Sequence, residues 1–405
     1  MIAIGHVVSV RHERIEVSMP ALPIGADVCV EIEPCRKVYA SVVACEPGRT
    51  FVLPNGPVDG VLPGMRVTER CDAGVRFGCA ALGYAIDAGA SRRLQTSVPR
   101  PAERGSVVRP LWTGIRAIDA LTTIGRGARV GIFGGPGLGK SVLVEWIVGG
   151  AHADAVVVAL VGERGREARA WLDLLGPKTT IVTATSDRCA RERVRAAEAA
   201  FAQARALAAR GLNVLLVLDS LARYATALRE LALASGEPVG RGGFPASVFS
   251  GMATLVEGAG AFECGSITLI ATVLDDGDQR DPVSEAARSL LDGHLQLSPR
   301  LAHEGRFPAL DIGSSVSRTM PLVATTGHRR NAALARAAIA ELDRSADARA
   351  MGIEGATPAI RAALAAESSL ERLLRQHDQA VCPTVTLAML QQTADILEEA
   401  YEHCL

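Results

Sequence analysis

The sequence has few aromatic residues, no long apolar run and almost no net charge. Phe, Trp and Tyr make up 4% of its 405 residues, and the formal net charge is −1 at pH 7. A nearly neutral chain has no overall electrostatic attraction to nucleic acid or to an anionic membrane, although a local basic patch could still form. No apolar run approaches the ~20 residues of a spanning helix, and the N-terminus lacks the pattern of a signal peptide. We therefore expect a cytoplasmic protein with no nucleic-acid partner.

The cysteines lack a pattern as well. There are nine of them, an odd number scattered along the chain, and no two form a CxxC pair. Paired spacing is the usual sign of a zinc site or of a redox couple, so the sequence supports neither. We interpret the cysteines as reduced thiols that mostly fill the core as small hydrophobes.

Apolar residues, in contrast, are plentiful. They make up 48% of the chain against 21% charged residues, so enough surface can be buried for stable folding. The length suffices for two or three domains. Residues 1–72 alternate apolar and polar residues over short runs separated by Pro and Gly turns, which predicts a small N-terminal β-barrel. Residues 73–110 have poor periodicity and frequent Gly, Ser, Arg and Pro, and we interpret them as a connecting segment.

Residues 111–325 show apolar runs of strand length, each followed by a segment of helical period. The expected strands are Ala128 to Phe133, Ala155 to Val161, Thr179 to Thr183, Val214 to Leu218 and Ile267 to Leu274. Apolar strands that alternate with helices indicate an α/β fold with a parallel sheet covered on both faces. From 326 to 405 the chain is rich in Ala, Leu and Glu at helical spacing, which predicts a C-terminal helical domain.

The segment that follows the first of these strands is a phosphate loop. Its residues are Gly134, Gly135, Pro136, Gly137, Leu138, Gly139, Lys140 and Ser141, and a helical run begins at Val142. The glycines allow positive φ, so that backbone N–H groups can turn inward around phosphate at a helix N-terminus. Lys140 is expected to reach the β- and γ-phosphates, and the Ser141 hydroxyl to ligate Mg²⁺. These residues, together with Val142, predict a site for ATP and Mg²⁺.

Two acidic residues follow later apolar strands. Asp219 comes directly after Val214 to Leu218 and is expected to hold Mg²⁺ through its water shell. An Asp in that position is, taken alone, more often a cap or turn residue. Glu163 follows the strand that ends at Val161 and could orient or deprotonate the water that attacks the γ-phosphate. The alternative for the charged cluster around Glu163 is a solvated loop with internal ion pairs.

Several longer segments resemble the ATPases of flagellar and type III protein export, which are similar to the catalytic subunits of rotary ATP synthases. The segments occur in the family's order and are GGPGLGKS, GERGRE, LLVLDSLARYATALRELALASGEP, GGFPASVF, DPVSEAARSLLDGHLQLS and FPALDIGSSVSR. This resemblance implies a RecA-like P-loop core between a small barrel and a helical domain. It covers most of the chain from Leu111 to Met320.

The resemblance also implies roles for individual residues. Glu163 matches the family's catalytic Glu, and Arg164 matches the adjacent Arg near the γ-phosphate. Glu167 matches an acidic residue that supports the water shell of the metal. Phe307 matches an aromatic residue against the adenine ring. Arg318 matches an arginine finger that acts on the nucleotide of a neighbouring subunit, which implies a ring, in this family a homohexamer.

The partners that the resemblance implies are those of an export machine. They are the stalk and regulator proteins of the secretion apparatus, effector–chaperone complexes, and the inner membrane, on whose cytoplasmic face the ring would lie peripherally. The stretch ATSDRCARERVR resembles the injectisome branch more than the flagellar one, so we predict type III secretion. The alternatives are a flagellar export ATPase and a non-catalytic nucleotide-binding subunit, against which Glu163 argues. A related RNA translocase would need stacking aromatics in the barrel, where only Tyr39 and Phe51 are notable.

Overall fold

A computed structural model describes residues 3–403 apart from 12–13, 34–35, 55–57, 71–76, 88–98, 276–280, 352–356 and 378. Parts of the expected connecting segment 73–110 therefore lie outside the described residues. No helix in the described part of the chain is both long and apolar enough to cross a membrane. The chain divides into two compact units, each assembled from separate stretches of sequence. Unit 1 comprises Met1–Val98, Val157–Ala206 and Leu218–Gly258, and unit 2 comprises Pro99–Val156, Leu207–Val217 and Ala259–Leu405.

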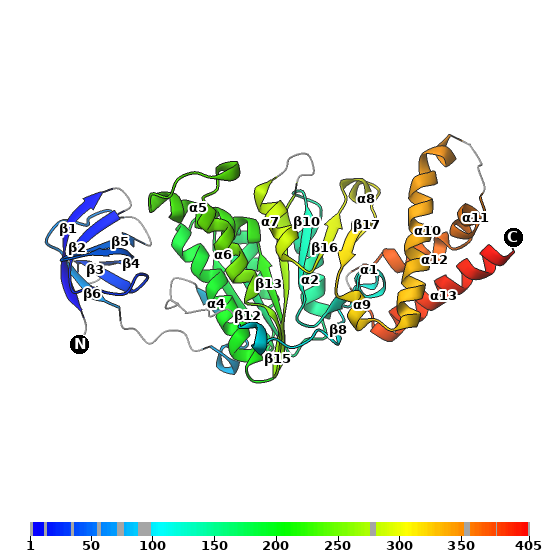
Figure 1. Cartoon of the computed structure of the whole chain (residues 1–405), viewed down its shortest axis with the longest axis horizontal. Helices are drawn as coiled ribbons and strands as arrows, with labels where there is room; N and C mark the ends of the chain where they lie inside the picture. Colours follow the sequence, from blue (N-terminus) through cyan, green and yellow to red (C-terminus); the bar gives the residue numbers. More distant parts are fainter. Residues whose placement is uncertain are drawn as a thin grey trace. The chain divides into compact units, whose positions relative to one another are not determined.

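The N-terminal part of unit 1 is a closed barrel, as the alternating sequence predicts (Figure 1). Its strands follow one another around the barrel in the order β1-β2-β5-β4-β3-β6. Strand β2 shows the alternation: Ile15 and Val17 are fully buried, while Arg14 and Ser18 are exposed. The bounds are β1 Ile4–Arg11, β2 Arg14–Ser18, β3 Asp27–Glu33, β4 Arg36–Glu46, β5 Arg49–Pro54 and β6 Arg66–Glu69.

A buried polar cluster joins the barrel to helix α4 (Ala190–Ala208) inside unit 1. The guanidinium of Arg195 forms an ion pair with the carboxylate of Asp27 on β3. The Ser41 hydroxyl donates to the same carboxylate at 3.0 Å. Because Arg195 and Asp27 are both buried, losing one partner would leave an uncompensated charge in the interior, which is strongly destabilising. The sequence patterns did not point to this contact.

The central sheet contains all five strands expected from apolar runs. They are β10 Arg129–Gly134, β11 Ala155–Val161, β12 Thr179–Ala184, β13 Asn213–Asp219 and β15 Gly265–Leu274. The whole of β11 is buried, and so is β13 after its first residue. Strands without an exposed face are expected where helices cover both sides of a sheet. The strand order is β17-β16-β10-β15-β13-β11-β12-β7, and β14 pairs with β15.

Four further strands extend the sheet beyond what the apolar runs predict. They are β7 Ala85–Asp87, β14 Gly260–Phe262, β16 Gly293–Leu297 and β17 Leu310–Ser317. Strand β7 lies in the expected connecting segment and pairs in parallel with β12. Strands β14 and β17 run antiparallel to their neighbours, so the sheet is mixed rather than purely parallel. These strands are short or half exposed, and a periodicity argument therefore finds them poorly. A separate two-stranded pair consists of β8 (Pro110–Leu111) and β9 (Ile124–Gly125).

Helices fill most of the remaining described chain. In the α/β region they are α1 Arg116–Leu121, α2 Lys140–Gly150, α3 Gly165–Asp173, α4, α5 Leu221–Ala234, α6 Ala246–Glu257, α7 Pro282–Leu290, α8 Pro299–His303 and α9 Met320–Val323. The C-terminal helices of unit 2 are α10 Thr326–Ala350, α11 Pro358–Ala365, α12 Glu367–Leu374 and α13 Pro383–Glu402. Helix α13 packs against α10, α11 and α12, which confirms the expected helical C-terminus (Figure 1).

Strand β10, which leads into the phosphate loop, is packed around a single ring. The side chain of Phe133 is fully buried and folds back over Gly131 on the same face of the strand. A Cβ atom at Gly131 would lie 2.3 Å from the Phe133 ring and 2.8 Å from Leu291. Both neighbours are buried, so neither can move aside without disturbing the core. Glycine at 131 is therefore required for space.

We expect Gly131→Ala to lower the free energy of unfolding by about 1–3 kcal/mol, because it overpacks the core beneath the phosphate loop. The matched control is Gly149→Ala in helix α2, where nothing lies within 4 Å of the added methyl group. Alanine favours a helix over glycine by up to ~1 kcal/mol, so the control should be neutral or stabilising. Chemical denaturation followed by circular dichroism measures both. Equal stability of the two variants would contradict the packing argument.

Candidate nucleotide site

The phosphate loop lies between the end of β10 and the start of α2, as the motif predicts. Gly137 and Gly139 have positive φ angles of 77° and 83°, and Gly139 is the N-cap of α2. L-residues rarely adopt this backbone conformation, so glycine is needed at both positions. At Gly134 glycine is favoured by close packing instead, because a Cβ atom there would lie 3.0 Å from Cβ of Leu297. We expected all four glycines of the loop to serve its turns, but at Gly134 close packing decides.

Lys140 is folded back onto its own loop. Its ammonium group donates to the carbonyl oxygens of Gly134 and Gly135, both at 2.6 Å. The charge is therefore held at the base of the loop. Binding of a triphosphate would exchange these neutral acceptors for charged ones, which form stronger hydrogen bonds. Ser141 is exposed in the first turn of α2, and Val142 beside it is also exposed.

Ionic contacts hold the base of the loop. The backbone N–H of Asp275, at the end of β15, donates to the Gly134 carbonyl at 3.2 Å. The Asp275 carboxylate pairs with Arg288 of α7 at 2.6 Å, and the Arg288 guanidinium lies 4.3 Å from the centroid of the Phe133 ring. The end of β10 is thus fixed from its backbone and from its buried ring. This arrangement gives the loop a rigid starting point.

Unit 1 contains the acidic residues that the sequence singled out. Glu163 follows β11 and is only 7% exposed, Glu167 lies in the first turn of α3, and Asp219 ends β13 and is also 7% exposed. Arg223 of α5 donates from Nε to the Glu163 carboxylate at 3.0 Å and also donates to the Gly162 carbonyl. The structure therefore brings Glu163, Glu167, Asp219 and Arg223 together as one cluster, which we call the carboxylate cluster.

The carboxylate cluster shifts the protonation of its members. Burial, the hydrogen bond to Glu167 and the charge of Asp219 together raise the pKa of Glu163 to about 8, against the opposing charge of Arg223. The pKa of Glu167 is lowered, first because it accepts that hydrogen bond from Glu163. These shifts favour a neutral Glu163 that donates to the Glu167 carboxylate. A carboxyl group whose pKa is near the working pH is suited to proton transfer.

Arg223 is a functional candidate that the sequence analysis did not name. Arg223 could have been noticed from its position, because it lies four residues after Asp219 in the family-like segment LLVLDSLARYATALRELALASGEP. Its contact with Glu163 depends on how α5 lies against the end of β11, and spacing along the chain does not reveal that. Arg164, which the resemblance places near the γ-phosphate, is exposed at the N-cap of α3.

The remaining two candidates lie in unit 2. Arg318 directly follows β17; it is exposed, and its backbone N–H donates to the Asp292 carbonyl at 3.0 Å. Phe307 is 39% exposed, and its carbonyl accepts from the backbone N–H of Gln376 at 2.9 Å. Both side chains are accessible on the chain taken alone, as a group that contacts an external ligand must be.

Comparison with known proteins agrees with this site. The family model described as "ATP synthase alpha/beta family, nucleotide-binding domain" matches residues 114–317. The flagellum-specific ATP synthase of Pseudomonas aeruginosa is 40% identical over 365 residues, which are 84% of this chain and 81% of that protein. The type 3 secretion system ATPase of Pseudomonas syringae pv. syringae is 41% identical over 355 residues, 81% of this chain and 79% of that protein. The chain belongs to the flagellar and type III export ATPase family.

A solved structure supports the same assignment for the whole fold. The assembled ATPase EscN from the type III secretion system of enteropathogenic E. coli matches with a TM-score of 0.87 and 38% identity, over 96% of this chain and 100% of that one. EscN in complex with its central stalk EscO matches with a TM-score of 0.88 and 37% identity. The recognition of the family, the three-part α/β fold and ATPase activity are thereby confirmed for this export ATPase.

The titration of Glu163 should appear in the pH dependence of ATP hydrolysis. If ionised Glu163 is the base, kcat/KM should rise by about tenfold per pH unit below the pKa and level off above about 8. Glu167→Gln removes a neighbour that raises the pKa, so its profile should level off at lower pH even if kcat falls. Asp173→Asn changes an exposed carboxylate at the end of α3 and should keep the wild-type midpoint. A midpoint that Glu167→Gln leaves unmoved would contradict the shared proton.

Proposed function

We propose that this export ATPase hydrolyses ATP at the interfaces of a homohexameric ring and thereby energises type III protein secretion. The observation that carries the proposal is Glu163, a buried carboxyl group that follows β11, pairs with Arg223 at 3.0 Å and lies beside Glu167 and Asp219. A subunit that only binds nucleotide has no need of a base with a pKa near neutrality. This feature therefore favours the enzyme over a non-catalytic scaffold of the same fold.

In the proposed reaction the phosphate loop and the carboxylate cluster act on one ATP molecule. The amides of the loop and Lys140 bind the β- and γ-phosphates, while ionised Glu163 accepts a proton from the attacking water. The water oxygen forms a bond to the γ-phosphorus as the bond to the bridging oxygen breaks and ADP leaves. Arg223 holds Glu163 in place, and Arg164 is available for charge that develops on the γ-phosphate.

The chemistry of the donor atoms fits Mg²⁺. This ion prefers one or two protein oxygens together with phosphate oxygens and water, rather than a cage of protein ligands. In the part of the chain that the structure describes, no three His, Cys, Asp or Glu side chains form such a cage. Ser141 offers an exposed hydroxyl, Asp219 a buried carboxylate and Glu167 an ionised one. Bound Mg²⁺ would supply positive charge to the β- and γ-phosphates; Ser141 would ligate it directly, and Asp219 and Glu167 through water.

Arg318 is assigned to the nucleotide of the next protomer. It is exposed after the edge strand β17, and the structural relative EscN was solved as an assembled ATPase. An arginine that arrives from a neighbour stabilises transition-state charge and is worth about 10³–10⁵ in rate in other nucleotide hydrolases. Hydrolysis would then depend on assembly. Phe307, half exposed in unit 2, is assigned to the adenine ring.

The partners proposed for the ring are those of a secretion apparatus. EscN forms a complex with its central stalk EscO, and we propose an equivalent stalk for this chain. Regulator proteins, effector–chaperone complexes and peripheral attachment at the cytoplasmic face of the inner membrane complete the proposal. An RNA partner is less favoured, because an arginine guanidinium lies over each of the barrel aromatics: Arg70 over Tyr39 and Arg14 over Phe51.

A mixing experiment tests whether sites are shared between protomers. Lys140→Ala should abolish nucleotide binding in its own site, and Arg318→Ala should abolish turnover while leaving binding intact. A mixed ring contains interfaces with an intact phosphate loop on one side and an intact Arg318 on the other. We therefore expect the mixture to recover part of the wild-type Mg²⁺-dependent ATPase rate, measured by phosphate release.

The control replaces Glu163 by Gln in the Arg318→Ala chain before mixing. In the proposed site, Glu163 and the phosphate loop come from the same protomer. A chain with both Arg318→Ala and Glu163→Gln therefore cannot complement Lys140→Ala. Recovery with the doubly substituted chain, or none with Arg318→Ala in rings shown by mass spectrometry to be mixed, would refute the assignment.

A further inference from the structure

A polar cavity lies in unit 2, at the end of the strands opposite the phosphate loop. It has a volume of about 440 Å³ and is bordered by residues that precede β8, by the start of β13 and by the β14–β15 turn. The phosphate loop follows the carboxyl end of β10, whereas this cavity is at the amino ends of β13 and β15, which is parallel to β10. The cavity therefore does not belong to the nucleotide site of its own chain.

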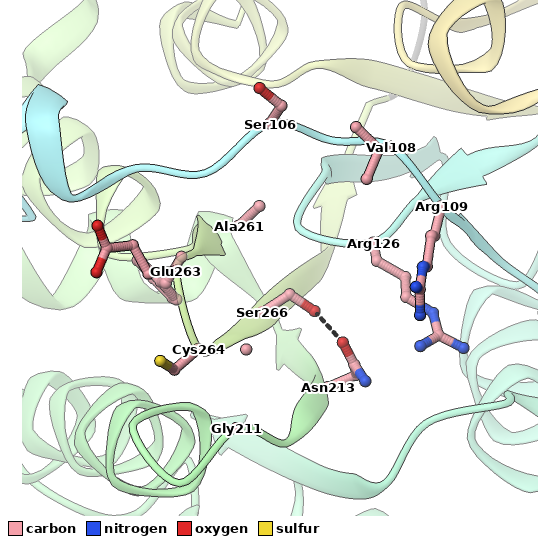
Figure 2. Close-up of a pocket in the computed structure, with 12 residues that line it drawn as sticks. Ser106, Val108, Arg109, Arg126, Gly211, Asn213, Ala261, Glu263, Cys264 and Ser266 are labelled. Carbon is pink, nitrogen blue, oxygen red and sulfur yellow. Dashed lines mark hydrogen bonds between the residues drawn. The ribbon is translucent and has the colours of Figure 1, made fainter.

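Two arginines lie on one side of this cavity. The backbone N–H of Arg126 donates to the Arg109 carbonyl at 2.8 Å, and the Nε of Arg126 donates to the Pro110 carbonyl at 3.3 Å. Figure 2 shows both side chains extending in the same direction, with Glu263 on the other side of the cavity. Across the residues that the structure covers, no carboxylate forms an ion pair with either guanidinium. Like charges held close together are destabilising unless an anion lies between them, so the pair of arginines favours an anionic ligand.

The arginine pair is directly linked to the finger residue. The backbone N–H of Gly125, beside Arg126, donates to the hydroxyl of Thr319, beside Arg318, at 3.0 Å. A Cβ atom at Gly125 would lie 2.3 Å from Val107, so the segments that bear the three arginines are tightly packed together. The segments that bear Arg109, Arg126 and Arg318 therefore lie together and form one edge of unit 2. If Arg318 contacts a neighbouring protomer, this edge faces the same neighbour.

An exposed carboxylate adjoins the catalytic Glu163 in unit 1. The loop after β12 is tied to Glu163 by the Ser186 N–H, which donates to the Glu163 carbonyl at 2.9 Å. The next residue, Asp187, is fully exposed, and a hydrogen bond from Thr185 lowers the pKa of its carboxyl group, which keeps it ionised. Asp187 thus offers an external negative charge beside the site that a neighbour's Arg318 would approach.

We propose that the cavity of Arg109 and Arg126 receives the Asp187 carboxylate of the neighbouring protomer, which aligns Arg318 on that protomer's nucleotide. The inference rests on the proposed ring. A ring needs a head-to-tail interface in which two different faces match. Here the face with the finger carries Arg109 and Arg126, and the face with Glu163 carries the exposed carboxylate of Asp187, next to Arg188. An arginine pair can bind a carboxylate with charge-assisted hydrogen bonds of defined direction, so the contact would set the orientation of neighbours as well as their attraction.

A charge swap tests this contact directly. Arg109→Glu with Arg126→Glu should weaken assembly at least tenfold, and Asp187→Arg should do the same, because each places like charges across the interface. All three changes in one chain restore opposite charges at every interface and should recover most of the assembly. Sedimentation velocity with a non-hydrolysable ATP analogue measures the apparent association constant, and ATPase rate per protomer follows it. Arg361→Glu with Arg372→Glu, on exposed positions of α11 and α12, should assemble as wild type.

The same variants are used to test whether the substitutions disturb folding and whether the cavity binds a free anion. Each variant should keep its thermal midpoint and its affinity for a fluorescent ATP analogue, since the cavity is remote from its own phosphate loop. Normal assembly of the Arg109/Arg126 variant, or a triple variant no better than its parents, would overturn the contact. So would calorimetric binding of inorganic phosphate that the two arginine changes abolish, because the cavity would then be a site for free anions.

The same experiment separates this inference from the proposed function. If wild-type chains never associate, both the proposed ring and the proposed Asp187 contact are refuted. Wild-type rings that lose turnover with Arg318→Ala, but tolerate Arg109→Glu with Arg126→Glu, would leave the ring intact and refute only the contact.

Discussion

The electrostatic problem of this site is to bring a triphosphate to buried carboxylates. Glu163 and Asp219 are both largely removed from water, and either charge alone would repel the γ-phosphate. Two features lower the repulsion: the raised pKa of Glu163 favours its neutral form, and Arg223 pairs with it. In the proposed reaction the ammonium of Lys140, bound Mg²⁺ and a neighbour's Arg318 neutralise the remaining charge. Each of these groups acts by lowering the repulsion between the γ-phosphate and the carboxylates.

The phosphate loop, Glu163 and Asp219 are all attached to rigid elements of the fold. The phosphate loop starts from a strand whose buried ring leaves no room for a side chain at Gly131, and its base is fixed by Asp275 and Arg288. Glu163 and Asp219 follow strands that are buried almost throughout. A site on strand ends moves less than a site on free loops, and proton transfer requires well-defined distances.

Much of the fold followed from periodicity. The five apolar strands, the barrel and the C-terminal helices were predicted because burial on both faces, alternation and helical spacing each leave a clear mark in sequence. Strands β7, β14, β16 and β17 were missed because they are short or half exposed and depend on neighbours for pairing. The candidate site was likewise predicted only in part. The phosphate loop was predicted because it is a local turn with its own glycine requirements. Arg223 was missed because it contacts Glu163 from a helix distant in sequence. The roles of Arg318 and Phe307 came from the family resemblance.

The sequence by itself determined the phosphate loop, the five apolar strands in their order along the chain and the family, because these depend on local backbone conformation and on neighbours in sequence. The tertiary structure decided the protonation of Glu163, since its pKa reflects burial and partners distant in sequence. It also decided that Arg109 and Arg126 lie together next to the segment of Arg318. Charges interact through space with a strength set by distance and by the surrounding solvent, and a linear sequence specifies neither quantity.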